Sequence, residues 1–258
     1  MISIIRILVR IKFFKRVIPS LTKKFFRLFN INNIIIKKEN IFLSINLKNP
    51  IDRQIFFKDD YEKEQIDYLK RLIKKYKIKR FIDIGAHMGI YSTLIGSDNV
   101  KVIAFEPYKE SFEQLKLNKL LNNFENLTIN NYALSDENKK ITMWVSDKEK
   151  TGGMSIYDKN DEELKKYKNE NLIKVEADSF IGDDVLKFEN EILAVKIDVE
   201  RHEYKVLKGI NKLLQKNNVV IQVEIFDKRQ NNIIRYLKEN NFINFHSINN
   251  DFYFKNFN

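Results

Sequence analysis

Apolar residues follow two different periods along most of this chain. From residue 81 onward, short continuous apolar runs alternate with longer segments in which apolar residues recur every three or four positions. The first pattern is typical of buried strands and the second of amphipathic helices. The apolar runs predict strands at residues 81–84, 102–106, 126–134, 193–200 and 219–226. The recurrences predict helices at residues 90–96, 111–123, 204–216 and 231–240. Strands that alternate with helices form a parallel sheet covered on both faces.

The end of the chain departs from this alternation. Residues 242–248 and 251–257 have the pattern of two strands, and Asn249 and Asn250 between them supply a turn. This hairpin would add one antiparallel strand at or near the edge of the sheet. We therefore expect an α/β fold with a Rossmann-like, doubly wound sheet of seven strands, one of them antiparallel.

Two segments precede the alternation, and one interrupts it. Residues 33–47 predict two short strands, and residues 60–76, with Tyr61 among the apolar positions at helical spacing, predict a helix. A polar stretch at about residues 138–176 predicts a hairpin or lid insertion. The chain then divides into a basic amphipathic segment with short strands at residues 1–50 and a main domain at residues 51–258.

The positive charge of the chain is concentrated at its start. The net charge is +11, and residues 1–38 hold ten Lys or Arg residues and no acidic residue. The other residues are about neutral, with 36 basic and 35 acidic groups. The main domain therefore lacks the excess of basic residues that marks a nucleic-acid-binding domain.

The basic segment also has an apolar stripe. On a helix, one face would carry Ile4, Ile7, Ile11, Phe14 and Ile18. Charges interrupt the apolar run too often for a signal peptide or a membrane span, and Pro19 is expected to interrupt the segment. Two interpretations stay open: a helix on an anionic membrane surface, or a helix packed on the main domain with a solvated basic face. An RNA-binding arm fits less well, because such arms rarely carry so many Ile and Phe residues.

Candidate chemistry begins in the stretch FIDIGAHMGIYS, which starts at Phe81. Gly85 and Gly89 lie directly after a predicted strand, where open α/β sheets bind their ligands. Glycine lets the backbone approach a ligand closely, and the next helix presents free N–H groups there. The glycine spacing differs from that of dinucleotide-binding loops. Asp83 can orient the turn, and Glu106, at the end of the next strand, is placed to accept hydrogen bonds from both ribose hydroxyls.

Three motifs, DIGAHMGIYS, AFEPYKESFEQLKLNKLLN and KIDVERHEYKVLKG, resemble those of the FkbM family of S-adenosylmethionine-dependent methyltransferases. They occur in the family's order and spacing over about residues 80–230. The family usually has Asn at the position of His87 and Gly at the position of Arg201. The resemblance implies a class I methyltransferase fold, S-adenosyl-L-methionine as cofactor and O-methyl transfer, commonly onto sugar, glycan or polyketide hydroxyls.

The same resemblance implies which residues contact the cofactor. His87 is expected to shape the loop or to touch the methionine moiety, and residues near the end of the third strand are expected to border the adenine. The predicted cofactor-binding residues are Asp83, Gly85, His87, Gly89, Tyr91, Glu106, Ala133 and Leu134.

Acidic residues and a histidine follow the fourth strand, across the predicted sheet from the glycine turn. A hydroxyl acceptor must lose a proton during methyl transfer, and a carboxylate or an imidazole can take it. We therefore predict Asp198, Glu200 and His202 as catalytic residues, and which of them is the base stays open. With an ordinary pKa of about 6.5, His202 would titrate in a useful range. Glu203 is expected to cap the next helix, and Glu224 to point into the same cleft. Such a cluster could also bind Mg²⁺, but no metal ligand is predicted.

These features predict an S-adenosylmethionine-dependent O-methyltransferase that acts on a hydroxyl of a sugar, a glycan or a related natural product. One alternative is an RNA methyltransferase that uses the basic N-terminus, although no Asn/Asp-Pro-Pro-Tyr/Phe motif follows the fourth strand. Another is a non-catalytic peripheral membrane protein with the same fold. A nicotinamide dehydrogenase is disfavoured by the glycine spacing and by the closing hairpin. The absence of cysteine excludes cytosine 5-methylation through a Cys nucleophile.

The expected partner is a small-molecule or glycan acceptor. Nucleic acid is not expected, an anionic membrane surface could bind through residues 1–30, and the sequence indicates no oligomeric state. We expect a cytoplasmic protein, either free or bound peripherally to the inner face of the membrane.

Overall fold

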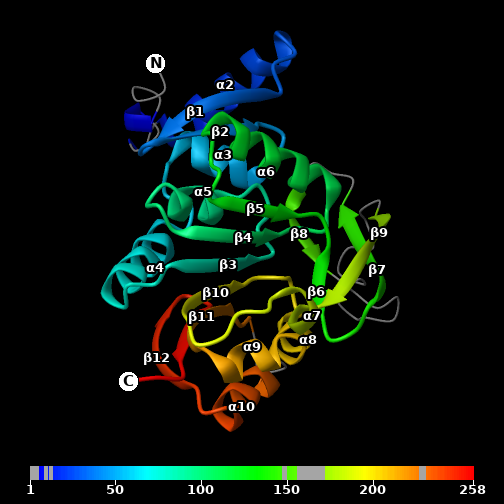
Figure 1. Cartoon of the computed structure of the whole chain (residues 1–258). Coiled ribbons are helices and arrows are strands. Elements are labelled where there is room, and N and C mark those ends of the chain that lie inside the picture. The colour runs from blue at the N-terminus through cyan, green and yellow to red at the C-terminus, as the bar shows by residue number, and fades with distance from the viewer. Residues whose placement is uncertain (1–5, 9–10, 12–13, 147–149, 156–171, 227–230) are drawn as a thin grey trace.

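The computed structural model describes residues 6–8, 11, 14–146, 150–155, 172–226 and 231–258 (Figure 1). The helices are α2 (Phe14–Leu28), α3 (Pro50–Phe57), α4 (Lys63–Lys75), α5 (Ile90–Gly96), α6 (Lys109–Leu121), α7 (Gly182–Val185), α8 (Glu203–Gly209), α9 (Asn211–Lys216) and α10 (Asn231–Glu239). The strands before the insertion are β1 (Asn33–Lys38), β2 (Ile41–Asn46), β3 (Arg80–Ile84), β4 (Lys101–Phe105), β5 (Leu127–Asn130) and β6 (Ala133–Ser135). The later strands are β7 (Lys139–Ser146), β8 (Lys150–Ser155), β9 (Leu172–Ile181), β10 (Ile192–Ile197), β11 (Asn218–Glu224), β12 (Ile243–Ile248) and β13 (Asp251–Lys255).

The main sheet is a parallel sheet closed by the C-terminal hairpin. Within the described residues it has seven strands in the order β12-β13-β11-β10-β3-β4-β5. Strands β11, β10, β3, β4 and β5 pair in parallel, whereas β13 runs antiparallel to both of its neighbours, β11 and β12. The hairpin thus inserts its second strand between β11 and the edge. The predicted Rossmann-like, doubly wound fold with seven strands, one of them antiparallel, is confirmed.

Helices cover both faces of the main sheet (Figure 1). On one face, the core includes Leu94 of α5 and Leu115 of α6. On the other face, it includes Val206 of α8 and Ile233 of α10. The two buried faces explain why the parallel strands have continuous apolar runs, as in β10, where every residue after the first is buried.

One predicted strand, at residues 126–134, is two strands in the structure. Strand β5 belongs to the main sheet, whereas β6 belongs to a second sheet with the order β6-β9-β7-β8. The side chain of Asn131, at the break, donates hydrogen bonds to the backbone oxygens of Glu106 (2.9 Å) and Pro107 (3.2 Å). These bonds hold the break beside the end of β4. The prediction of a single strand was wrong because the apolar pattern does not reveal a change of sheet.

The predicted insertion at residues 138–176 contributes to this second sheet. Strand β7 pairs antiparallel with β8, as the hairpin prediction required, and also with β9. Residues 147–149 and 156–171 lie outside the described residues, so the role of the insertion as a lid stays a prediction.

The N-terminal part packs on the main domain through α6. Strands β1 and β2, both predicted, form an antiparallel pair. Asn118 of α6 and Asn122, its C-cap, accept hydrogen bonds from the backbone N–H groups of Ser44 and Phe42, both at 2.7 Å. The predicted interruption at Pro19 was wrong, because this residue lies inside α2; proline loses one helical hydrogen bond but keeps a helical φ. None of the helices in the described ranges is long and apolar enough to cross a membrane.

Two further helices differ from the predictions. Helix α3 was missed, although its start has a clear signal: Asn49 accepts a hydrogen bond from the N–H of Ile51 (2.9 Å), and Pro50 is the first helical residue. The helix predicted at residues 204–216 is two helices, because the backbone at Ile210 (φ −109°, ψ 20°) leaves the helical conformation.

Candidate active site

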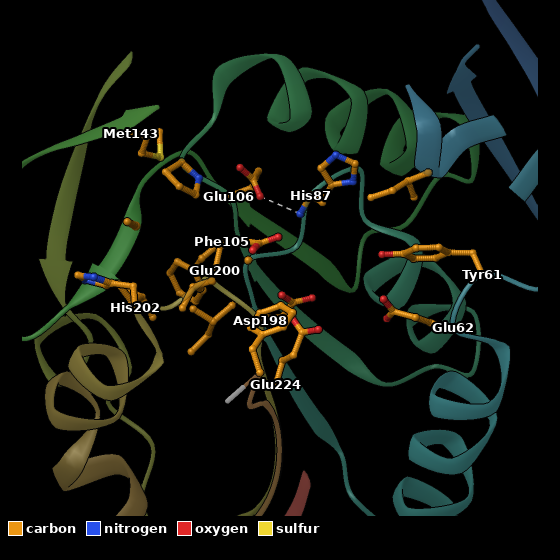
Figure 2. Close-up of a pocket in the computed structure, with 18 residues that line it drawn as sticks. Tyr61, Glu62, His87, Phe105, Glu106, Met143, Asp198, Glu200, His202 and Glu224 are labelled. Carbon is orange, nitrogen blue, oxygen red and sulfur yellow. Dashed lines mark hydrogen bonds between the residues drawn. The ribbon is translucent and has the colours of Figure 1, made fainter. Parts of the chain in front are cut away.

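A cavity of about 350 Å³ lies at the carboxyl ends of the parallel strands (Figure 2). Ligands of open α/β sheets bind at this edge. The predicted site residues that line the cavity are Gly85, His87, Glu106, Ala133, Leu134, Asp198, Glu200 and His202. Glu224 lines it as well, as expected. Sequence reasoning missed other lining residues, among them Ile51, Tyr61, Glu62, Met143 and Phe226.

The turn between β3 and α5 is held by its backbone. Gly85 (φ 83°), His87 (φ 51°) and Gly89 (φ 82°) all have left-handed conformations. The N–H groups of Gly85 and Ala86 both donate to the carbonyl oxygen of Phe105, each at 3.0 Å. A Cβ atom on Gly85 would lie 1.8 Å from the carbonyl oxygen of Asp198. Glycine is therefore required here by the neighbouring strand as well as by φ.

Glu106 fastens the same turn to the end of β4. Its Oε2 atom accepts a hydrogen bond from the N–H of His87, and its Oε1 atom accepts one from the N–H of Tyr108, both at 2.8 Å (Figure 2). Burial raises the pKa of Glu106 to about 7. Each carboxylate oxygen accepts one backbone N–H and keeps a lone pair for a further donor.

A buried ion pair lies beneath the cavity. The Nζ atom of Lys196, whose side chain is 4% exposed, is 2.8 Å from Oδ2 of Asp198. Burial alone would raise the pKa of Asp198, but the charge and hydrogen bond of Lys196, together with the hydrogen bond of Glu224, outweigh it and lower this pKa below its ordinary value. Burial would likewise lower the pKa of Lys196, but Asp198 and Asp83 raise it above its ordinary value. Asp198 is therefore the ionised carboxylate of the site.

Two further carboxyl groups lie close to Asp198 and behave differently. Burial and then the negative charge of Asp198 raise the pKa of Glu200 to about 8. The same two causes, in the same order, raise the pKa of Glu224, which hydrogen-bonds to Asp198. Near neutral pH, both groups therefore hold a proton beside an ionised carboxylate. No group of three or more His, Cys, Asp or Glu residues is arranged to hold a metal ion in the described part of the chain.

Tyr61 and Glu62 form the opposite wall of the cavity from His202 (Figure 2). The predicted helix at residues 60–76 begins later, at α4, because Glu62 has a left-handed backbone (φ 45°). This turn directs both side chains toward the cavity, and burial raises the pKa of Glu62. Helical spacing alone placed Tyr61 on the core-facing stripe, and no sequence signal indicated the turn.

Neither histidine of the site titrates near neutral pH. Burial lowers the pKa of both His87 and His202 to about 4. The Nε2 atom of His202 lies 2.9 Å from the hydroxyl oxygen of Ser135. The Nε2 atom of His87 is buried and has no hydrogen-bond partner among the residues that the structure describes. The expectation that His202 titrates with an ordinary pKa was therefore wrong, because burial outweighs the nearby carboxylates.

Three of the predicted cofactor-binding residues lie behind the cavity wall. Asp83 is buried and accepts a hydrogen bond from the hydroxyl of Ser92 (2.6 Å). A Cβ atom on Gly89 would lie 2.2 Å from a methyl carbon of Leu115. Tyr91 accepts a hydrogen bond from Gln222 (3.2 Å) and packs over the ammonium of Lys196. In the structure, these residues support the glycine turn and the ion pair.

The turn after β10 has two consecutive left-handed residues, Glu200 (φ 52°) and Arg201 (φ 79°). Glu203, which begins α8, accepts hydrogen bonds from the N–H groups of Arg201 (2.9 Å) and Val199 (3.3 Å) and thus holds this turn. His87 and Arg201 are the two positions where the motifs depart from the FkbM pattern, which has Asn and Gly there. Those residues adopt left-handed backbone most readily; His tolerates it better than most residues do, whereas Arg has no such preference.

A comparison with known protein families identifies the family of the region that supplies most of the cavity lining. The family model described as the methyltransferase FkbM domain matches residues 83–243, which is more than half of the chain. A search of curated proteins finds no match.

The solved structures that resemble this chain include methyltransferases of several kinds. The methyltransferase FkbM from Methylobacillus flagellatus KT is 14% identical over 69% of this chain, with a TM-score of 0.44, and this chain spans only 43% of its length. The tRNA (uracil-54, C5)-methyltransferase of Pyrococcus abyssi, in complex with S-adenosyl-L-homocysteine, is 12% identical over 87% of this chain and 43% of its own, with a TM-score of 0.45. An rRNA methylase from Streptococcus thermophilus is 11% identical over 74% of this chain and 92% of its own, with a TM-score of 0.43.

The left-handed turn at Arg201 predicts an unusual order of stabilities. Both Arg201→Gly and Arg201→Ala remove the guanidinium, but only glycine removes the strain of φ 79°. We expect the Gly variant to be about 1 kcal/mol more stable than the Ala variant in urea unfolding.

The matched control is Lys116, an exposed residue inside α6. There the Ala variant should be more stable than the Gly variant by about 0.5–1 kcal/mol. The same order at both positions would contradict a left-handed Arg201.

Proposed function

The chain belongs to the methyltransferase FkbM domain family, and we propose that it transfers the methyl group of S-adenosyl-L-methionine to a hydroxyl oxygen of a sugar, a glycan or a related natural product. The observation that carries this proposal is the proton-holding carboxyl of Glu200. It lines the cavity beside the glycine turn, next to a carboxylate that stays ionised.

The residues of the cavity fit S-adenosylmethionine. The cavity volume of about 350 Å³ is within the range of small-molecule sites. The lone pairs left on Glu106 suit the two ribose hydroxyls, and the apolar side chains of Ala133, Leu134 and Met143 suit an adenine ring. At the other end of the cavity, Asp198 supplies a negative charge that suits a sulfonium and an ammonium group.

The cofactor supplies an electrophilic methyl group on a cationic sulfur. The protein must then remove the proton of the acceptor hydroxyl, and the three predicted catalytic residues differ in their fitness for this task. Lys196 holds Asp198 ionised at a low pKa, which makes it a weak base. The low pKa of His202 has the same consequence. Glu200, with a pKa of about 8, is the strongest base of the three once it is deprotonated.

Asp198 then acts as a positioning residue. Its charge raises the pKa of Glu200, and its hydrogen bond with Glu224 keeps a second carboxyl protonated in the same cleft. The O–H of Glu224 donates to Asp198, so its other oxygen remains free to accept a hydrogen bond from a hydroxyl of the acceptor. This division of roles requires that the buried cation of Lys196 remain in place.

The charge distribution favours a neutral acceptor over RNA. Residues 39–258 carry 36 basic and 35 acidic groups, so this part has almost no net charge to attract a polyanion. The test is a screen in which the radiolabelled methyl group of the cofactor is offered to nucleotide sugars, glycans, lipid-linked saccharides and RNA. Label in a saccharide supports the proposal, and label only in RNA overturns it. No binding of the cofactor at all would indicate a non-catalytic protein with this fold.

Glu106→Ala should weaken the binding of S-adenosylmethionine by about 10- to 100-fold in isothermal titration calorimetry. Hydrogen bonds to a charged group contribute about 1.5–3 kcal/mol each, and the substitution also releases the turn at His87. Glu113→Ala, at an exposed position on α6, is the control and should leave the affinity unchanged. Equal affinities for the two variants would remove Glu106 from the cofactor site.

The pKa of Glu200 predicts the pH dependence of the reaction. Only the deprotonated carboxyl can take a proton, so kcat/KM for the acceptor found in the screen should rise with pH and level off above about pH 8. Glu200→Gln should lower kcat/KM by about 10²- to 10⁴-fold and abolish the rise.

His202→Gln is the companion variant. It should keep the rising limb, because the pKa of His202, about 4, lies far below that range. If the rise of kcat/KM with pH were lost in His202→Gln and kept in Glu200→Gln, His202 would be the base in place of Glu200.

A further inference from the structure

The N-terminal segment exposes an apolar surface that the cavity does not use. We call the side chains of Ile7, Ile11, Val17, Leu21, Phe25, Leu28 and Phe29 the outer face; each of them is at least 41% exposed. Four of them, Val17, Leu21, Phe25 and Leu28, recur along one stripe of α2. Clustered exposed apolar side chains are typical of an interaction site.

A neighbouring stripe of α2 already packs on the domain. Ile18 and Phe26 contact the core cluster, and the ring of Phe26 meets that of Phe56 edge to face, with 6.0 Å between the centroids. The apolar surface of the helix therefore extends beyond the stripe that packs on the domain. A helix at the surface of a domain would ordinarily present polar side chains on its outer side, so the packing on the domain does not account for the outer face.

The segment is also fixed in place at its start. Arg6 donates hydrogen bonds to the carbonyl oxygens of Phe56 (2.9 Å) and Ile55 (3.1 Å), and it pairs with Asp59 (3.1 Å). Lys38 pairs with the same carboxylate at 2.7 Å. These contacts hold the start of the segment against α3, and α2 lies at the edge of the molecule (Figure 1).

We propose that the outer face docks on an anionic lipid bilayer. Residues 1–38 carry ten basic residues and no acidic residue, which matches the negative charge of such a surface. An apolar helix face flanked by cations lies in the interface between headgroups and acyl chains. No helix in the described ranges can cross a bilayer, so the contact is one of surface binding.

Charge also separates this occupant from its rivals. In a second copy docked face to face, two basic segments would come together and repel one another. A nucleic acid would satisfy the cations but would leave Leu21, Phe25 and Leu28 against a polyanion. A bilayer with anionic headgroups complements both the positive charge of the segment and its exposed apolar side chains.

The test is co-sedimentation of the full chain with two kinds of vesicle, an equal mixture of phosphatidylglycerol and phosphatidylcholine, and phosphatidylcholine alone. We expect binding to the mixed vesicles, little binding to the neutral ones, and release from the mixed vesicles at high salt. The double variant Phe25→Asn/Leu28→Asn keeps the charge and removes two apolar side chains. It should lower the partition coefficient by about tenfold or more.

The matched control is Ile243→Asn, an exposed apolar residue at the first position of β12. It should bind mixed vesicles as the wild type does. Leu28→Asn alone, at the most exposed position of the outer face, repeats the test with one change at the last residue of α2. The proposal is overturned if the wild type does not bind mixed vesicles, or if both outer-face variants bind them as the wild type does. It is also overturned if the wild type is a dimer that the double variant breaks and vesicle binding is absent.

Discussion

The ion pair between Lys196 and Asp198 places one fixed negative charge among the buried carboxyl groups of the site. It joins a buried ammonium to a carboxylate at the end of β10, where the sheet meets the cavity. Burial raises the pKa of Glu200 and Glu224, and the charge of this ionised carboxylate raises both further. The site thus combines a fixed negative charge with carboxyl groups that can hold and release a proton. This combination suits both a cationic cofactor and a hydroxyl acceptor.

The glycine turn, and the Glu106 carboxylate that holds it, can be predicted from the sequence because both depend on local geometry. Gly85 and Gly89 have positive φ, and Glu106 follows the next strand at the distance that a βαβ unit dictates. The alternation of apolar runs and helical periods likewise predicts the sheet, down to its antiparallel strand. In these regions, local pattern and global fold agree.

Other parts of the site depend on contacts between distant segments. Tyr61 and Glu62 reach the cavity through a left-handed residue before α4, and the spacing of apolar residues does not reveal such a turn. Ala133 and Leu134 lie in a different sheet from Glu106, although a single apolar run suggested one strand. The pKa of His202 depends on its burial, and its ring lies beside Ser135 of β6, a strand of the second sheet.

Helix α3 connects the two functional regions of the molecule. Its first turn contributes Ile51 to the cavity, and its last turn offers the carbonyl oxygens of Ile55 and Phe56 to Arg6. A helix leaves the carbonyl groups of its last turn without partners of its own, so the guanidinium acts as a C-terminal cap supplied by a distant segment. A chain shortened at its N-terminus would lose this cap as well as the outer face. The effects of truncation would therefore extend along α3 to the cavity wall. Single substitutions on the outer face leave the cap at Arg6 intact, whereas a deletion removes the cap and the outer face together.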